Sequence, residues 1–298
     1  MTPASPASSV RVDPARFAAD FPRRPFLADH VHHEDPRLTL DAVVELALLL
    51  PPESVEYNTG DLDVNQDPKA IVDNGLGIRE TLSQMGQKNS WMVLKNIERA
   101  PAYAALLRRS LAAMAPEVRQ AVGAVSDVEG FIFVSSPGAV TPFHNDPEHN
   151  FLFQVQGTKT VRIWDVDDRV VVTEALLEAA CAGAHRNLPH RPEYDDRAQV
   201  FELQPGVGLH FPVQAPHWVE NGPEVSISYS FTFRSPLSHG QRKVRFVNGL
   251  LRRAGLTPQA VGESTKNDAV KLRAYDALAV PMAVARRSRT LKKLFLKR

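Results

Sequence analysis

The sequence predicts a mainly β protein with flanking helices and a helical extension at its C-terminus. Short aromatic and β-branched segments, separated by Gly, Pro or Asn, fill residues 129–234 and are typical of strands. The segments on either side carry apolar residues at helical spacing. A chain of 298 residues with 43% hydrophobic and 23% charged residues suits one large globular domain with an appendage, and excludes a disordered or fibrous protein.

These patterns divide the chain into four parts. Residues 1–20 are rich in Ala, Ser and Pro and predict a mobile N-terminus, with order beginning near Pro22. We assign residues 21–128 to the helical and strand-forming N-terminal part of a barrel domain, 129–235 to its β core, and 236–298 to a basic helical extension.

Two helices and one strand are expected before the β core. Thr39 caps a helix that ends at Pro51, and Pro101 opens a second helix that extends to Gly123. Between them, residues 89–98 show the apolar alternation of a strand.

Six segments are the expected strands of the β core. They are residues 131–136, 150–155, 158–166, 199–204, 208–213 and 225–233. A helical insertion at 173–184 and a polar loop at 185–198 interrupt them, and the length and mixed charge of that loop favour a mobile lid. Helical spacing returns after Ser238.

Membrane-spanning, secreted and thiol-dependent proteins are not expected. The longest apolar helical stretch, residues 42–50, contains Glu45 and is far short of the ~20 residues that span a bilayer. The N-terminal residues have neither the basic nor the apolar region of a secretory signal, so a cytoplasmic location is expected. The single cysteine, Cys181, lies in an Ala-rich helical pattern without a basic neighbour, and we interpret it as a small buried residue.

Charge is distributed unevenly along the chain. From residue 240 onward there are fifteen Lys and Arg against three Asp and Glu, so this end carries +12 and the remainder −11. For residues 240–282 we favour packing within the chain or between the subunits of a homodimer. Contact with nucleic acid, anionic lipid or an acidic protein is the alternative, and for the final sixteen residues the choice stays open.

The residues that carry chemistry are His144, Asp146 and His217. Residues two apart on a strand project from the same face, so His144 and Asp146 can offer ligand atoms to one ion. His217 follows a short apolar strand and a turn at Pro216. Two histidines and one carboxylate form the facial triad that leaves coordination positions open on Fe(II). Zinc accepts the same ligands, so a zinc-dependent hydrolase or isomerase is an alternative.

The segments around these ligands resemble the two motifs of the cupin superfamily. The first motif is matched by Gly138, His144 and Asp146, with Asp in place of its second His. The second is matched by Gly206, Pro212, His217 and Asn221, with Gln214 where the motif usually has Gly. This resemblance implies a double-stranded β-helix, a small antiparallel barrel of the cupin or jelly-roll type that holds the metal at its mouth.

A closer resemblance is to the JmjC-like Fe(II)/2-oxoglutarate-dependent oxygenases, especially the asparaginyl hydroxylase that inhibits hypoxia-inducible factor. The segment from Thr141 to Lys159, TPFHNDPEHNFLFQVQGTK, is similar to the motif of that family without a gap. The resemblance implies that His144, Asp146 and His217 hold iron. It also implies that Thr141 and Lys159 bind the distal carboxylate of 2-oxoglutarate, for which an ammonium is a suitable partner.

Two positions depart from the family's pattern. An Asn of the family's final core strand corresponds to Ser230, a smaller donor, and a Tyr from its early strand corresponds to Met92 or Val93. We place Ser230 and Asn150, which lies within the matched segment, in the predicted co-substrate site. The departures predict altered co-substrate binding and leave a non-enzymatic cupin that binds a ligand or nucleic acid as an alternative.

Other histidines are not expected to be ligands. His30, His32 and His33 lie in a polar stretch and predict a solvated turn, and His149 is expected on the strand face opposite Asp146.

The resemblance as a whole implies an Fe(II)- and 2-oxoglutarate-dependent dioxygenase. It would hydroxylate a protein side chain or a small metabolite and release succinate and carbon dioxide.

Overall fold

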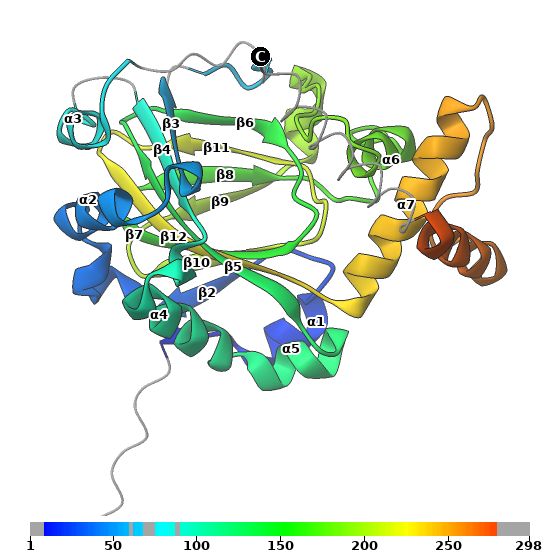
Figure 1. Cartoon of the computed structure of the whole chain (residues 1–298), viewed down its shortest axis with the longest axis horizontal. Coiled ribbons are helices and arrows are strands. Elements are labelled where there is room, and N and C mark those ends of the chain that lie inside the picture. The colour runs from blue at the N-terminus through cyan, green and yellow to red at the C-terminus, as the bar shows by residue number, and fades with distance from the viewer. Residues whose placement is uncertain (1–8, 60–61, 68–74, 87–89, 279–298) are drawn as a thin grey trace, which may run out of the picture. The chain divides into compact units, whose positions relative to one another are not determined.

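The computed structural model describes residues 9–59, 62–67, 75–86 and 90–278 (Figure 1). The chain divides into two compact units. The first, here called the β unit, comprises Met1–Val172 and Arg186–Pro236, and the second, the helical unit, comprises Thr173–His185 and Leu237–Arg298. The predicted mainly β character is confirmed, because the β unit is built around two antiparallel sheets.

The larger sheet has the strand order β1-β2-β10-β7-β12-β5-β4-β3. Its strands are β1 Val10–Arg11, β2 Phe26–His30, β3 Val55–Thr59, β4 Ser90–Lys95, β5 Ser126–Ser135, β7 His149–Gln156, β10 Val207–Phe211 and β12 Ser226–Arg234. The smaller sheet has the order β6-β11-β8-β9. Its strands are β6 Val140–His144, β8 Lys159–Ile163, β9 Gln199–Leu203 and β11 His217–Asn221. Every strand that the sequence predicts is present.

One face of the larger sheet, here called the outer face, packs against helices. Phe151 and Phe153 of β7 and Phe231 of β12 belong to an apolar core that also contains Val43 and Leu106. The helices of the β unit are α1 Pro14–Asp20, α2 Leu40–Leu49, α3 Ile78–Ser83, α4 Pro101–Ala112 and α5 Ala115–Val122. Its 3-10 helices are η1 His32–Glu34, η2 Pro36–Leu38, η3 Pro52–Ser54, η4 Ile97–Arg99 and η5 Pro192–Arg197. Figure 1 shows α2, α4 and α5 on the side of this sheet away from the smaller sheet.

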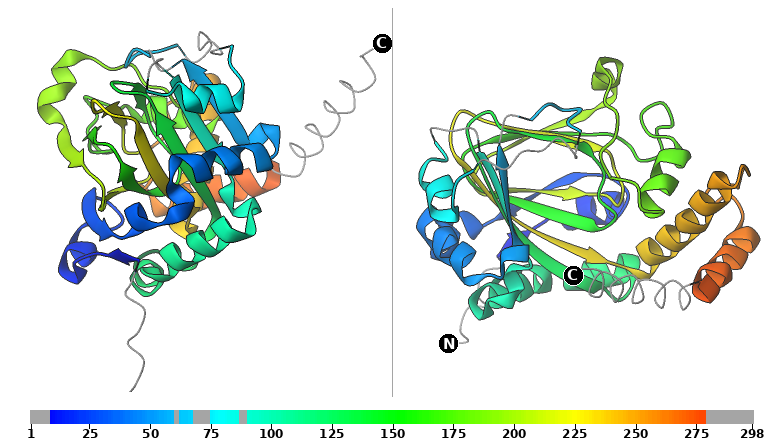
Figure 2. Two further views of the ribbon diagram at one scale, coloured as in Figure 1. Left: turned by 90° about the vertical axis from the view of Figure 1, so that its left-hand side faces the viewer. Right: turned by 45° about the horizontal axis from the view of Figure 1, so that its top comes forward.

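The opposite, inner face of the larger sheet faces the smaller sheet (Figure 2). Leu152 of β7 and Phe211 of β10 form a second core with Val161, Ile163 and Val219 of the smaller sheet. Alternate residues of one strand therefore reach different environments, the outer core or the space between the sheets.

Three expectations for the N-terminal part need correction. Residues 1–8 lie outside the described range. Residues 10–20 were expected to be mobile, but they contain β1 and α1. The Asp13 side chain caps α1, and Phe17 of this helix is buried. The predicted helix from Pro101 to Gly123 is two helices, with Pro116 in the first turn of α5. His30 and His32 are buried rather than in a solvated turn, because both rings pack on Phe153.

The helical unit contains the predicted insertion and the first part of the basic extension. Its helices are α6 Glu174–Cys181, α7 Pro236–Arg253 and a helix at residues 265–278. Pro236, the first residue of α7, belongs to the β unit. Cations of α7 pair with acidic groups of the same unit, as in Arg245 with Glu174 and Arg252 with Glu178. Cys181 is half-buried, not fully buried as predicted. The final part of the basic extension, residues 279–298, lies outside the described range.

No helix in the described part of the chain has both the length and the apolar character required to cross a bilayer.

Candidate metal centre

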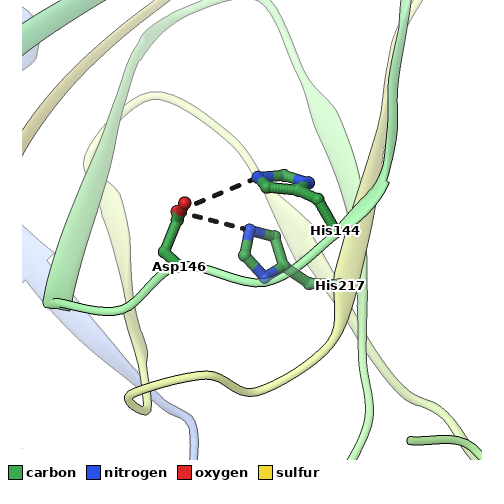
Figure 3. A group of neighbouring side chains, drawn as sticks. All are labelled: His144, Asp146 and His217. Carbon is green, nitrogen blue, oxygen red and sulfur yellow. Dashed lines mark ion pairs between the residues drawn. The ribbon is translucent and has the colours of Figure 1, made fainter. Parts of the chain in front are cut away.

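Two strand ends of the smaller sheet bring the predicted metal ligands together. His144 at the end of β6 lies directly opposite His217 at the start of β11, with ring centroids 4.2 Å apart. Asp146 lies two residues beyond the end of β6, and its Oδ2 is 3.8 Å from the Nε2 atom of each histidine (Figure 3). One ligand atom from each residue falls within 4.8 Å of the others. In the described residues this is the one group of His, Cys, Asp and Glu with such geometry.

Backbone carbonyls fix the tautomer of both histidines. His144 Nδ1 lies 2.7 Å from the carbonyl oxygen of Pro142, and His217 Nδ1 lies 2.9 Å from that of Ala215. A carbonyl can only accept, so each Nδ1 carries the proton and donates it. Each Nε2 is left with a free lone pair, which is the arrangement that metal-ligating histidines adopt.

The protonation states also suit a cation. Burial, assisted by the neighbouring His217, lowers the pKa of His144 to about 3, and burial likewise lowers the pKa of His217. Burial alone would raise the pKa of Asp146, but the Arg186 guanidinium and the two imidazoles together bring it down to about 2. Neutral imidazoles and an ionised carboxylate are the forms that bind a metal.

A bulge in β6 places Thr141 on the same face as the metal ligands. His144 pairs with His217, whereas Thr141 pairs with Val219, so β6 has one residue more than β11 between these two pairs. Without the bulge, residues three apart would point to opposite faces. Val219 belongs to the core between the sheets, so Thr141 also lies on the inner side.

Lys159 lies on the same inner side, as the sequence requires of a co-substrate ligand. It is two residues from Val161 and four from Ile163 along β8, so its side chain projects from the same face as these two inner-core residues. Lys159 is 5% exposed, and no hydrogen bond and no neighbouring charge among the described residues affects its ammonium. Burial lowers its pKa to about 8. An unpaired buried ammonium is unfavourable unless an anion joins it.

The other two predicted co-substrate residues contact each other. Ser230 Oγ on β12 donates to Asn150 Oδ1 on β7 over 2.6 Å, and both side chains are buried. They lie on the inner face, since Asn150 is two residues from Leu152 of the inner core. Met92 belongs to the outer core, so Val93 is the inner-face residue of β4 where the family has its Tyr.

The turn before His217 keeps its geometry despite the absence of Gly. Gln214 has a φ of 60°, in the left-handed region that Gly favours. Its backbone N–H donates to the carbonyl oxygen of Asp146 over 2.7 Å. This bond connects the loop that carries Asp146 to the turn that leads into His217.

Arg186 is a site residue that the sequence did not reveal. Its NH1 donates to Asp146 Oδ1 over 2.6 Å, and its side chain is 57% exposed. Forty residues separate the two partners, and neither periodicity nor a motif connects them.

The loop that carries Arg186 is anchored and does not form the free lid predicted from its composition. The N–H of Leu188 donates to the carbonyl oxygen of Phe143 over 2.8 Å, and the N–H of Phe143 donates to that of Val64 over 2.8 Å. The Asn65 side chain accepts from the backbone N–H of His190 and donates to its carbonyl oxygen. Two loops therefore add to the free edge of β6, the edge strand of the smaller sheet.

His149 is excluded as a ligand, in agreement with the sequence analysis. Its ring packs on Phe21 and Phe233 at the outer face. His210 lies in the same aromatic surroundings, stacked at 6.4 Å from His149.

No protein-family model matches the sequence. No curated protein is similar to it at a significant level. Among solved structures, an X-ray structure of Escherichia coli YcfD is similar, with 18% identity and a TM-score of 0.52 over 91% of this chain and 68% of that chain. A structure of the same E. coli protein, described as a ribosomal oxygenase in complex with cobalt and 2-oxoglutarate, has 18% identity and a TM-score of 0.51 over the same shares. The chain therefore shares the fold of a 2-oxoglutarate-binding oxygenase, and the resemblance expected from the sequence is confirmed for the fold.

Proposed function

We propose that this protein is an Fe(II)- and 2-oxoglutarate-dependent oxygenase whose two sheets form a double-stranded β-helix. One observation carries the proposal: the triad of His144, Asp146 and His217 and the unpaired ammonium of Lys159 lie on the same inner side of one small sheet. A metal triad alone also suits zinc enzymes. A buried cation on the same face, opposite Asn221 and so four residues along β11 from His217, supplies the partner that the distal carboxylate of a dicarboxylate co-substrate needs.

Each residue has a separate role in this proposal. His144, Asp146 and His217 would hold the iron, and Thr141 and Lys159 would bind the distal carboxylate of 2-oxoglutarate. Asn150 and Ser230 would add hydrogen bonds from the larger sheet. Bound iron and 2-oxoglutarate supply the oxidation, in which one atom of O2 enters succinate, the other enters the substrate as hydroxyl, and carbon dioxide leaves.

The chain itself orients the reactants and limits water. Both imidazoles are held by backbone carbonyls, so their rings are oriented before metal binds. The side chain of His217 is only 5% exposed and that of Asp146 is 14% exposed, so the ligands are screened from solvent on most sides. Such shielding strengthens the electrostatic interactions of a bound dicarboxylate.

A protein side chain is the substrate class that we favour over a small metabolite. One of the similar E. coli structures is described as that of a ribosomal oxygenase, which supports a protein substrate for the same fold. Nucleic-acid contact by the basic extension is less favoured, because Lys243, Arg245 and Arg252 of α7 pair with acidic residues of the helical unit. Homodimer formation through the helical unit stays part of the proposal.

Anaerobic titration tests the function directly. Purified apoprotein receives Fe(II) and then 2-oxoglutarate, and we expect the weak visible charge-transfer band of a keto acid chelated to ferrous iron. His217→Ala is the matched control and should show neither metal nor band. Stoichiometric Fe(II) without a band in the wild-type protein would contradict the oxygenase proposal and favour a ligand-binding cupin. A preference for zinc, with hydrolysis and no use of 2-oxoglutarate, would favour the hydrolase.

A further inference from the structure

Asp146 presents its two oxygens to different partners. Oδ2 faces both histidine Nε2 atoms at 3.8 Å, whereas Oδ1 accepts from the NH1 of Arg186 at 2.6 Å. A charge-assisted bond of this length is among the stronger hydrogen bonds in proteins. One oxygen is therefore directed at the metal position and the other is already engaged.

The backbone of Arg186 is held by the strand that carries the ligands. The backbone N–H of Asn145 donates to the carbonyl oxygen of Arg186 over 3.3 Å, and Asn187 forms an antiparallel bridge with His144. The N–H of Leu188 donates to the carbonyl oxygen of Phe143. Arg186 thus enters the site from a segment that is hydrogen-bonded to the metal strand on both sides of His144.

The geometry points to Arg186 as a positioning residue that keeps Asp146 monodentate, an inference that rests on the proposed function. A carboxylate can bind a metal through one or both oxygens. Fe(II) held by two imidazole nitrogens and one carboxylate oxygen keeps three open positions. A bidentate Asp146 occupies one of them, and then 2-oxoglutarate and dioxygen compete for the remaining two. By retaining Oδ1, Arg186 preserves the third position.

The inference predicts a specific pattern when the guanidinium is removed. In Arg186→Ala, Asp146 is free to chelate with both oxygens, so the metal stays bound and 2-oxoglutarate fills the two positions that remain, which leaves none for dioxygen. A general loosening of the loop would instead weaken metal and co-substrate together. Lys donates one charge-assisted bond in place of the Arg fork, so Arg186→Lys should restore part of the wild-type behaviour.

Cobalt(II) is the probe, since its visible spectrum responds to coordination number and it does not consume oxygen with the co-substrate. Full-length wild type, Arg186→Ala, Arg186→Lys and Arg191→Ala are loaded anaerobically and measured before and after 2-oxoglutarate is added. Arg191 is exposed, lies in the same loop, and has no side-chain partner among the described residues, so its variant matches the charge change. Circular dichroism confirms that each variant is folded.

We expect one Co(II) per chain in all four proteins. Arg186→Ala should have an altered Co(II) spectrum both without and with 2-oxoglutarate, because Asp146 Oδ1 then fills a position that the wild type leaves open, while its 2-oxoglutarate affinity should stay within about tenfold of the wild type. Arg186→Lys should fall between, and Arg191→Ala should match the wild type. An unaltered Co(II) spectrum in Arg186→Ala overturns the inference. If 2-oxoglutarate affinity were nevertheless weakened in that variant, Arg186 would contact the co-substrate directly and would not act through Asp146.

Loss of Co(II) from folded Arg186→Ala would also overturn the inference. Failure of the proposed function has a different signature. If the wild type binds Co(II) but not 2-oxoglutarate, the oxygenase proposal fails, while the comparison of Co(II) spectra without co-substrate still tests the role of Arg186.

Discussion

The two faces of β12 differ in chemistry although they belong to the same nine residues. The outer face carries Ile227, Tyr229, Phe231 and Phe233, which belong to the apolar core beneath the helices. The inner face carries Ser226, Ser228, Ser230 and Thr232, which are buried polar residues. The period of two in a strand thus separates side chains that stabilise the fold from side chains that face the site.

Most of the buried polar side chains that the inner face presents are paired with one another. On the inner side, Gln154 and Ser228 bond to each other, as do Asn150 and Ser230, but Lys159 has no partner among the described residues. An unpaired charge is costlier to bury than an unpaired neutral group, and the proposed co-substrate would supply the partner that the ammonium lacks. The comparison therefore predicts that outer-face changes alter stability, whereas inner-face changes alter binding.

The largest expected effect is loss of the metal centre. His217→Ala removes one of three ligands, and we expect Fe(II) binding and oxygenase activity to fall together. The decrease should exceed the roughly 10–100-fold that is typical when a residue hydrogen-bonded to a metal ligand is changed. Metal analysis and succinate release check this. Stoichiometric Fe(II) in this variant would contradict the triad. The free energy of unfolding of the apoprotein should change little, as expected for a functional residue.

The next largest effect is on stability and comes from the outer face. Phe231 is fully buried in the outer core. Phe231→Ala should lower the free energy of unfolding by about 3–5 kcal/mol, through lost burial and the cavity that remains. Urea denaturation measures this, and Co(II) affinity of the folded fraction should stay near that of the wild type. A loss of binding at unchanged stability would break the division between the faces.

Lys159→Met should stabilise the apoprotein and remove co-substrate binding. Burial brings the pKa of Lys159 from 10.5 to about 8, so the unfolded chain binds the proton more tightly than the folded chain does. The free energy of unfolding of the wild type should therefore decrease as pH falls from about 10.5 to 8, and this decrease should persist below pH 8. We expect the variant to gain roughly 1–3 kcal/mol at pH 7.

The matching measurement for Lys159→Met is thermal unfolding with and without 2-oxoglutarate. The wild type should show a rise in Tm on addition of the co-substrate, and the variant should show none while it keeps its metal. Loss of iron in the variant would contradict the separate roles assigned to Lys159 and the triad.

Acid should destabilise the protein through histidines of the outer face. His210 is fully buried, its Nε2 has no partner in the described part of the chain, and burial lowers its pKa to about 3. Because this pKa lies below that of the unfolded chain, stability falls as pH drops below about 6.5. At pH 5 the loss from His210 is about 2 kcal/mol. Chemical denaturation of His210→Phe between pH 7 and 5 should show a shallower decline.

Ser230→Ala is the smallest change and sharpens the comparison most. It removes one donor to Asn150 on the inner face. We expect 2-oxoglutarate affinity to fall by less than about tenfold and stability to change by about 1 kcal/mol, the range of a single neutral hydrogen bond. Isothermal titration of Co(II)-loaded protein provides the measurement. Complete loss of co-substrate binding would make Ser230 as important as Lys159.

Sequence predicted the strands and the triad because these depend on local patterns. Short aromatic and β-branched segments located β7 and β12, and the spacing of His144, Asp146 and His217 located the candidate metal site. The contribution of Arg186 depends on two segments forty residues apart, which no local pattern connects. The composition of its loop predicted mobility. The hydrogen bonds that anchor this loop come from backbone groups and from Asn65, and composition cannot reveal them.

Burial was also difficult to predict for polar residues. Adjacent histidines in a polar stretch favour solvent, yet His32 packs against Tyr229 and contacts Ser110 in the outer core. Only the packing of distant elements decides this. Similarly, the choice between Met92 and Val93 needed the register of β4 against β5, which assigns Met92 to the outer core.

The way in which the two loops attach to β6 has an evolutionary consequence. Phe143 is held at that edge by the backbone carbonyl oxygen of Val64 and the backbone N–H of Leu188. Every residue has such a carbonyl, and every residue except proline has such an N–H. Substitutions in these loops can therefore accumulate, and reshape the surroundings of the site, without displacing the strand that carries His144. Such tolerance is consistent with a fold that is shared at 18% identity.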